Sequence, residues 1–250
     1  MTETASAPAA AEKPAALWED FVDVFTNPSA VFARRRDGRA GLAIVLYTLL
    51  GLLTFYVARP ALQPAFDRQI AAQVAKVNAN PQYSADQKEK ITAQMRSFTD
   101  SPLTYVGPMF VLPISLSVTA LVLWAVGKGF GSVASYGQAL AVTAVGGIPR
   151  AVLALLTAGL FSATGHTVSS QYGLTLSPAA LLGPDASDVV AALASRLDVG
   201  VLWHTVLLGV GLAIVGRIPR GKGLSAAAIV WVIGGVAVLL TALRTVAAAS

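Results

Sequence analysis

The chain has no cysteine and very little charge, and both absences restrict what it can be. Without cysteine there is no disulfide, no thiol nucleophile and no cysteine metal site. Charged residues form 12% of the 250 residues, whereas soluble domains carry about 25%. Hydrophobic residues form 55%, and the mean hydropathy is +0.65. This composition excludes a disordered chain, a disulfide-rich secreted domain and an ordinary cytosolic enzyme. It predicts an all-α protein that crosses a membrane several times.

Groups that carry catalysis or bind cofactors are equally scarce. The two histidines, His166 and His204, lie far apart in the sequence and give no histidine metal site. Residues 216–223 nearly match the phosphate-binding loop GxxxxGK[ST], but Gly223 stands where Ser or Thr is required and no strand is expected before it. We therefore expect no catalytic residue, no metal and no cofactor. The net charge of +5 does not indicate nucleic acid, because the basic residues flank hydrophobic segments.

The N-terminal residues divide into a polar tail and an amphipathic segment. Residues 1–16 are rich in Ala, Pro, Glu and Thr, which predicts a disordered cytoplasmic tail. The residues before the first hydrophobic segment include acids and no long apolar run, so we expect no signal peptide. In residues 17–39, apolar side chains recur at helical spacing and a basic run follows.

The segment 17–39 predicts a helix that lies in the membrane surface. Lipid-headgroup contacts are expected from Trp18, Arg34, Arg35, Arg36 and Arg39. These arginines would bind anionic phospholipid at the cytoplasmic face. The alternative is that Trp18 and Phe21 pack on the protein itself.

Five segments are long and apolar enough to cross a bilayer as helices. They are residues 40–58, 103–126, 138–161, 198–216 and 224–243. The first has 19 residues, or about 28 Å of helix, which is close to the ~30 Å thickness of the hydrocarbon. Lys and Arg are densest within residues 34–39 and 217–222. That density predicts a cytoplasmic N-terminus and, with five spans, an outside C-terminus.

Two longer polar segments are expected on the outer side. Residues 59–102 predict a helical hairpin, because Asn80-Pro81 supplies a turn and Ser84 with Gln87 resembles a capping box. Apolar faces on both helices of this hairpin should rest on the spans or on the lipid surface. Residues 162–197 predict a loop with a short helix near its end.

Arg150 is the most informative residue, because it follows Pro149 inside the third span. Pro149 should kink or break the helix. A charge deep in the bilayer costs at least about 2.5 kcal/mol, so a partner is expected. Asp198 and His204 begin the fourth span at a similar depth, which predicts a polar cluster of the three residues. The cluster could be a ligand, lipid or proton site, or an ion pair that fixes helix packing. In a third alternative, a broken third span places Arg150 at an interface.

Small residues recur every four positions on the third span. Ala139, Thr143 and Gly147 would let another helix approach closely. Whether that helix belongs to the same chain or to a second copy is left open by the sequence.

Three stretches together resemble a known family of membrane proteins. They are the aromatic-Pro-aromatic lead at 21–32, the stretch from Ser135-Tyr136 to Pro149, and the stretch from Asp198 to Trp203 with the glycines after it. This pattern resembles the Yip (Ypt/Rab-interacting protein) family in its bacterial branch, over roughly residues 18–245. The resemblance implies five membrane helices, a cytosolic N-terminus and a non-enzymatic role in a bacterial inner membrane. The Rab-linked role of eukaryotic relatives does not transfer to a bacterium.

The leading hypothesis is a membrane scaffold that binds proteins or lipids. Its expected partners are the bilayer itself, other membrane proteins or a second copy, and not nucleic acid. The alternative is a small transporter or channel with a polar site around Arg150, since buried charge beside a broken helix marks substrate paths. An intramembrane enzyme is the third hypothesis.

Overall fold

The computed structural model describes residues 17–101, 106–168, 170, 172–183 and 186–247. Over these residues it contains nine α-helices and one short 3-10 helix, and no strand. The predicted all-α fold is therefore confirmed. Five of the helices are long and apolar enough to cross a membrane. The predicted tail at 1–16 lies outside the described residues.

The five long helices correspond to the five expected spans. They are α3 (Gly41–Ala79), α5 (Val106–Gly129), α6 (Tyr136–Ala163), α8 (Val199–Gly216) and α9 (Arg220–Ala247). The shorter elements are α1 (Leu17–Thr26), α2 (Pro28–Arg34), α4 (Ala85–Asp100), α7 (Asp188–Ser195) and the 3-10 helix η2 (Pro178–Leu181). The predicted capping box forms before α4, where the backbone N of Gln87 donates to Ser84 Oγ and Ser84 N donates to Gln87 Oε1.

The boundary expected near Arg59, between the first span and the hairpin, is not a helix end. α3 runs unbroken for 39 residues and includes both Pro60 and Pro64. A proline removes one backbone donor, but the helix continues where other groups satisfy the freed carbonyls. α6 likewise continues through Pro149, so the alternative of a broken third span is wrong.

Residues in the last turn of α6 and just beyond it supply hydrogen-bond donors to α3 at this point. Ser162 Oγ donates to the carbonyl of Val57 at 2.5 Å, and the backbone N of Val168 donates to the carbonyl of Ala61 at 2.9 Å. Both carbonyls lie within a turn of the prolines. These bonds tie the end of α6 to the middle of α3.

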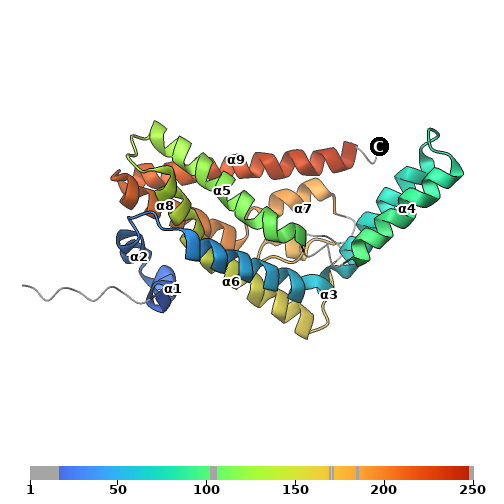
Figure 1. Cartoon of the computed structure of the whole chain (residues 1–250), viewed down its shortest axis with the longest axis horizontal. Coiled ribbons are helices and arrows are strands. Elements are labelled where there is room, and N and C mark those ends of the chain that lie inside the picture. Colours follow the sequence, from blue (N-terminus) through green and yellow to red (C-terminus); the bar gives the residue numbers. More distant parts are fainter. Residues whose placement is uncertain (1–16, 102–105, 169, 171, 184–185, 248–250) are drawn as a thin grey trace, which may run out of the picture.

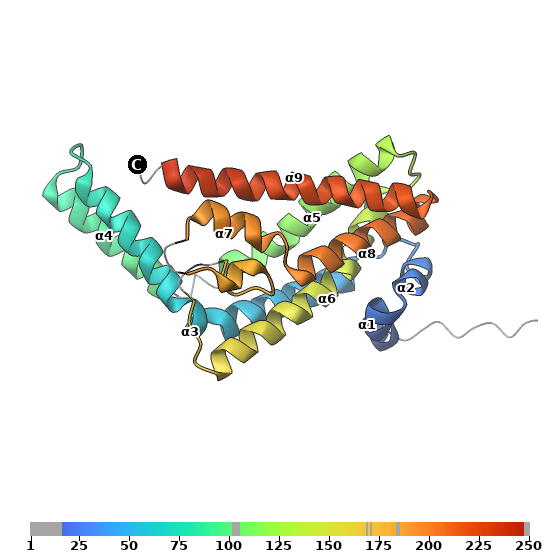
Figure 2. The same cartoon turned by 180° about the vertical axis from the view of Figure 1, so that it is seen from behind.

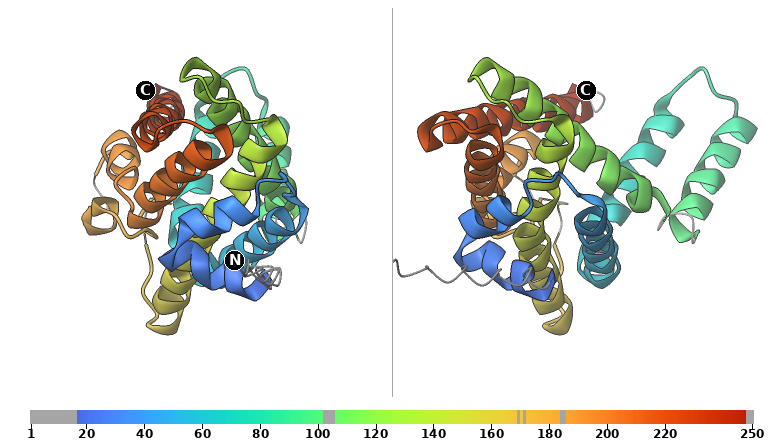
Figure 3. Two further views of the ribbon diagram at one scale, coloured as in Figure 1. Left: turned by 90° about the vertical axis from the view of Figure 1, so that its left-hand side faces the viewer. Right: turned by 60° about the vertical axis from the view of Figure 1, so that its left-hand side comes forward.

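α6 lies at the centre of the bundle. It packs against α3, α5 and α8, and α8 packs in turn against α9. Figures 1 and 2 show α1 and α2 at one end of the molecule and the α3–α4 hairpin at the other. We call residues 59–100, the second half of α3 with α4, the arm. Figure 3 shows that the arm stands apart from the rest of the bundle.

Glycines allow α6, α8 and α9 to approach one another closely. A Cβ on Gly211 of α8 would lie 3.2 Å from Phe32 Cδ1, and one on Gly146 of α6 would lie 3.8 Å from Phe32 Cζ. Phe32 is 1% exposed and so fills the space between the two helices. Further along α8, a Cβ on Gly209 would lie 2.8 Å from the Cα of Leu224 in α9, which is too close for any side chain.

We predict that Gly209→Ala destabilises the bundle, because the added methyl group must push the backbone of α9 away. Forced overpacking of this kind costs about 1–3 kcal/mol, which should lower the Tm of the detergent-solubilised protein by several degrees. Gly159→Ala on α6 is the matched control, since its Cβ would meet no atom within 4 Å. Equal melting temperatures for the two variants would contradict the close α8–α9 contact.

Candidate functional site

Arg150 lines an open cavity at the side of the bundle. The cavity has a volume of about 310 Å³ and lies between α6, the start of α8, α9 and the outer loop. Its polar lining includes Arg150, Arg196, Asp198, Tyr172 and Thr175. Arg150 itself is exposed, whereas the preceding residues 141–149 are buried. The arginine therefore marks the point where the packed bundle gives way to an open cavity.

Asp198 lies close to Arg150, but the two do not form an ion pair. A Cβ on Gly200 would lie 3.1 Å from Asp198 Oδ1 and 3.3 Å from Arg150 Cγ, so both side chains lie close to the backbone of Gly200. The Asp198 carboxylate instead accepts hydrogen bonds from backbone N atoms, at 3.0 Å from Val201 and 2.8 Å from Leu176. It caps α8 and holds the outer loop to it. In the described part of the chain, Arg150 forms no hydrogen bond or ion pair with any residue.

His204 is separated from the other two residues of the expected cluster. Its ring lies in the packing between α6 and α8, where a Cβ on Gly146 would be 3.6 Å from His204 Cδ2. The Nε2 atom is buried and has no hydrogen-bond partner among the described residues. The structure thus brings Arg150 and Asp198 into one cavity and places His204 inside the bundle. Nowhere in the described chain do three His, Asp or Glu side chains converge where they could bind a metal ion.

Arg196 is the cavity residue that sequence reasoning missed. Its Nη2 donates to the carbonyl of Trp231 at 2.8 Å, and Trp231 Nε1 donates back to the carbonyl of Arg196 at 3.2 Å. The guanidinium also lies over the Trp231 ring, 5.5 Å from its centroid. Gly234 leaves space for it, since a Cβ there would be 3.3 Å from Arg196 Nη2. Burial lowers the pKa of Arg196, and the nearby positive charge of Arg150 lowers it further.

The segment α1–α2 packs on the bundle through part of its apolar face. Val24 and Val31, like Phe32, are fully or almost fully buried. Phe21 stays 37% exposed. Val24, Val31 and Phe32 therefore anchor the segment, while Phe21, one of the two residues named in the alternative of packing on the protein, is left partly exposed. The side chain of Trp18 lies outside the part of the chain that the structure describes.

Two of the arginines expected at lipid headgroups form ion pairs within the protein. Arg34 Nη2 lies 2.8 Å from Asp20 Oδ1 and 2.6 Å from Asp23 Oδ2. Arg35 Nε donates to Asp20 Oδ2 at 2.6 Å. The hydrogen bond with Asp23 raises the pKa of Arg34 and outweighs its desolvation. Arg34 and Arg35 thus link α2 to α1.

The other two arginines of the basic run remain open. Arg36 is exposed. The Arg39 side chain is 87% exposed and makes only a loose pair with Asp37 at 3.2 Å. Contact of this run with anionic lipid stays a prediction, now carried mainly by Arg36 and Arg39.

The small-residue face of α6 packs within the same chain. Ala139, Thr143 and Gly147 are all buried. A Cβ on Gly147 would lie 2.9 Å from Tyr47 Cε2, so α3 of the same chain is the partner there. Thr143 Oγ1 donates to the carbonyl of Ala139 at 2.8 Å and needs no further partner.

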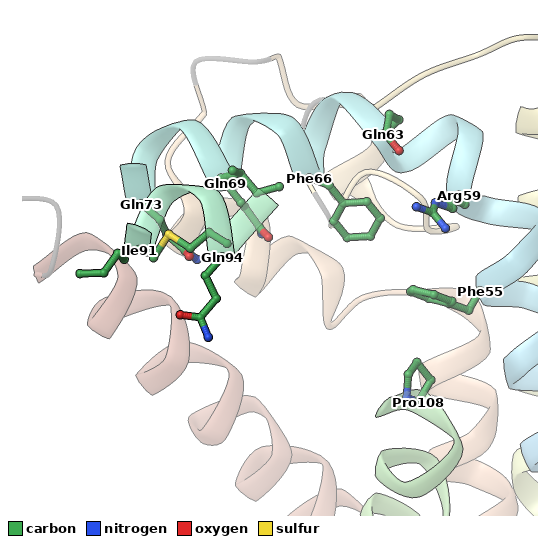
Figure 4. Close-up of a pocket in the computed structure, with 11 residues that line it drawn as sticks. Phe55, Arg59, Gln63, Phe66, Gln69, Gln73, Ile91, Gln94 and Pro108 are labelled. Carbon is green, nitrogen blue, oxygen red and sulfur yellow. The ribbon is translucent and has the colours of Figure 1, made fainter. Parts of the chain in front are cut away.

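A second site lies at the base of the arm. A groove of about 710 Å³ runs between the second half of α3, α4 and the start of α5. Figure 4 shows its side chains pointing inward from these three helices. The apolar lining includes Phe55, Phe66, Ile91 and Pro108, and the polar lining is mainly glutamine: Gln63, Gln69, Gln73 and Gln94. The apolar faces of the hairpin helices therefore line an open groove. The glutamines beside those faces are the one feature of the sequence that indicates this groove.

A family model described as the Yip1 domain matches residues 22–241, which is most of the chain. The match begins in α1 and ends in α9, and so it includes all five spans and the arm. No curated protein gives a match, and no solved structure gives one.

We predict that Asp20→Asn loosens the segment α1–α2, because it leaves Arg34 and Arg35 without their shared anion. The Asp20 side chain is 11% exposed but both arginines are about a third exposed, so we expect a loss of about 1–2 kcal/mol. Faster hydrogen exchange in α1 and α2 and a lower Tm would report it. Asp37→Asn removes an exposed pair and should change little. An equal drop in Tm for both variants would show that the ion pairs of Asp20 stabilise the protein no more than the exposed pair of Asp37.

Proposed function

The chain belongs to the Yip1-domain family and is a multi-pass integral membrane protein; from that premise we propose that it is a non-enzymatic scaffold, which binds another membrane protein through its arm. In this proposal the N-terminus is cytoplasmic and the arm lies outside a bacterial inner membrane. The dense basic residues near α2 and in the turn between α8 and α9 favour that orientation.

The groove of the arm is the observation that carries the proposal. Its apolar floor would bury hydrophobic side chains, and its glutamine rim offers both donors and acceptors. A protein segment needs both, because it brings backbone amides along with its side chains. A lipid chain would leave the amides without a partner. The groove therefore fits an amphipathic segment of another membrane protein, and we commit to that occupant.

The spans that support the arm leave much of their surface free for partners in the membrane. Only 6% of the apolar window of α3 and 17% of that of α5 are buried inside the molecule. α6 and α8, in contrast, are mostly buried. A scaffold needs a rigid centre and open flanks, and this distribution supports one.

The packing of the bundle favours binding over transport. Toward α2, the cavity at Arg150 gives way to Val142, Leu207 and Leu212, all of which are at most 1% exposed. These residues belong to one apolar cluster with Phe32. A solute would have to open this cluster to pass.

We predict that a photo-crosslinking amino acid placed at Gln94 gives a defined adduct with a membrane protein in living cells. Gln94 lines the groove, whereas Ala93, about 100° further round α4, is exposed outside the lining and serves as the matched control. The adduct should be several-fold stronger at position 94, and Ile91→Asp in the groove should abolish it.

Two results would overturn the proposal. One is equal crosslinking at positions 93 and 94 that Ile91→Asp does not change. The other is movement of a solute across liposomes by the purified protein alone, which would put the transporter hypothesis in its place.

A further inference from the structure

The cavity at Arg150 holds more positive charge than the protein neutralises. Arg150 and Arg196 both line it, and Asp198 is its only described acidic group. The Asp198 carboxylate is already taken by two backbone N–H groups. Two guanidinium groups therefore share a small space with one engaged carboxylate. The two positive charges repel each other, so Arg150 disfavours the charged form of Arg196.

Hydrogen-bond donors in the cavity are also left over. Among the described residues, Arg150 and the Tyr172 hydroxyl have no hydrogen-bond partner, and neither residue is fully buried. The remaining hydroxyl groups are used, because those of Thr157, Thr175 and Ser195 donate to backbone carbonyls at 2.9 Å, 3.0 Å and 2.7 Å. An acceptor-rich anion in the cavity would give Arg150 and Tyr172 a partner.

We propose that this cavity binds a phosphate group, held between Arg150 and Arg196, a site separate from the groove of the arm and independent of the scaffold proposal. Arginine is suited to phosphate because its planar fork donates two parallel hydrogen bonds to two oxygens. A volume of about 310 Å³ lies at the lower end of ligand pockets, which span about 300–1,000 Å³. It accommodates a phosphate with a small substituent such as glycerol.

The position of the cavity matches the depth of a lipid headgroup. Arg150 lies against Gly200, in the first turn of α8. α8 has 18 residues, or about 27 Å of helix, so it barely spans the ~30 Å of hydrocarbon and its first turn falls at the interface. Figure 2 shows the outer loop and α7 lying between α9 and the α3–α6 pair, over this end of α8. The phosphate of an anionic phospholipid is one source of the ligand, and a free phosphate is the other.

The test uses the full-length purified chain and compares both sources. Protein is reconstituted in vesicles of phosphatidylcholine with phosphatidylglycerol, extracted gently, and examined by native mass spectrometry for retained lipid. In parallel, its Tm in detergent is measured with and without inorganic phosphate. Arg150→Gln is the main variant, because Arg150 is exposed and forms no hydrogen bond or ion pair with a described residue, and Gln keeps the Cγ atom that lies against Gly200. Arg244→Gln, at the exposed far end of α9, is the matched control.

We expect the wild type and Arg244→Gln to retain phosphatidylglycerol over phosphatidylcholine, with about tenfold weaker retention in Arg150→Gln. Stabilisation by inorganic phosphate without lipid selectivity, lost in Arg150→Gln, would support the site and identify the soluble source. Retention and stabilisation that are the same in Arg150→Gln as in Arg244→Gln would overturn the proposal. Absence of both effects in the wild type would overturn it as well. Arg196→Gln should also lose the ligand. Because Arg196 is hydrogen-bonded to Trp231, the Tm of this variant without ligand is first compared with that of the wild type, to separate loss of binding from loss of stability.

Discussion

Close approach of helices at glycine is the constraint on which the rest of this structure depends. In lipid there is no hydrophobic force between helices, so their association rests on van der Waals packing and on hydrogen bonds. α8 meets α9 at Gly209, meets α6 and α2 at Gly211, and α6 meets α3 at Gly147. Because each contact is filled by a neighbouring side chain or backbone, the central helices form a packed frame. The arm, the outer loop and the segment α1–α2 are attached to that frame.

The two ends of the frame differ in whether their arginines are paired with carboxylates. At the α1–α2 end, Asp20 and Asp23 neutralise Arg34 and Arg35. Phe32 fills the space between α6 and α8 there. At the α7 end, Arg150 and Arg196 share a cavity with a carboxylate that is committed to the backbone. A charge near the end of a short span costs much less than one at the bilayer centre, so Arg150 persists there without an ion pair. The charges at the α1–α2 end are thus paired within the protein, whereas the two arginines at the α7 end have no ion-pair partner among the described residues.

The sequence predicted the elements of the fold well and their junctions less well. Hydrophobic length was enough for the five spans, and local capping signals were enough for the start of α4 at Ser84. The continuity of α3 through Pro60 and Pro64 was not predicted, because a proline inside a helical pattern usually marks its end. The hydrogen bonds from Ser162 and Val168 to α3 near these prolines come from a distant part of the chain, so the local sequence does not show them.

The candidate site shows the same limit. Burial cost and sequence depth predicted a cluster of Arg150, Asp198 and His204. Arg150 and Asp198 line one cavity, whereas His204 is not part of its lining. Burial cost and depth did not predict that capping α8 would occupy the carboxylate. Arg196 gave no signal of its own, since its importance comes from Trp231 and Gly234, which lie on another helix. Asp198 could either cap α8 or pair with Arg150. The outer loop decides between them, because its residue Leu176 also donates to the carboxylate. The position of that loop cannot be seen in the linear sequence.

The two proposed sites are joined by one helix–helix contact. The groove of the arm begins at Phe55 on α3, two turns after Tyr47, which packs on Gly147 of α6. Gly147 lies one turn before Arg150 on α6. Because α3 has no break at Arg59, a partner that binds the arm contacts the same continuous helix that packs against α6. A partner on the arm and an anion in the cavity therefore bind to two helices that press directly against each other, and any coupling between them has a short, packed route to follow.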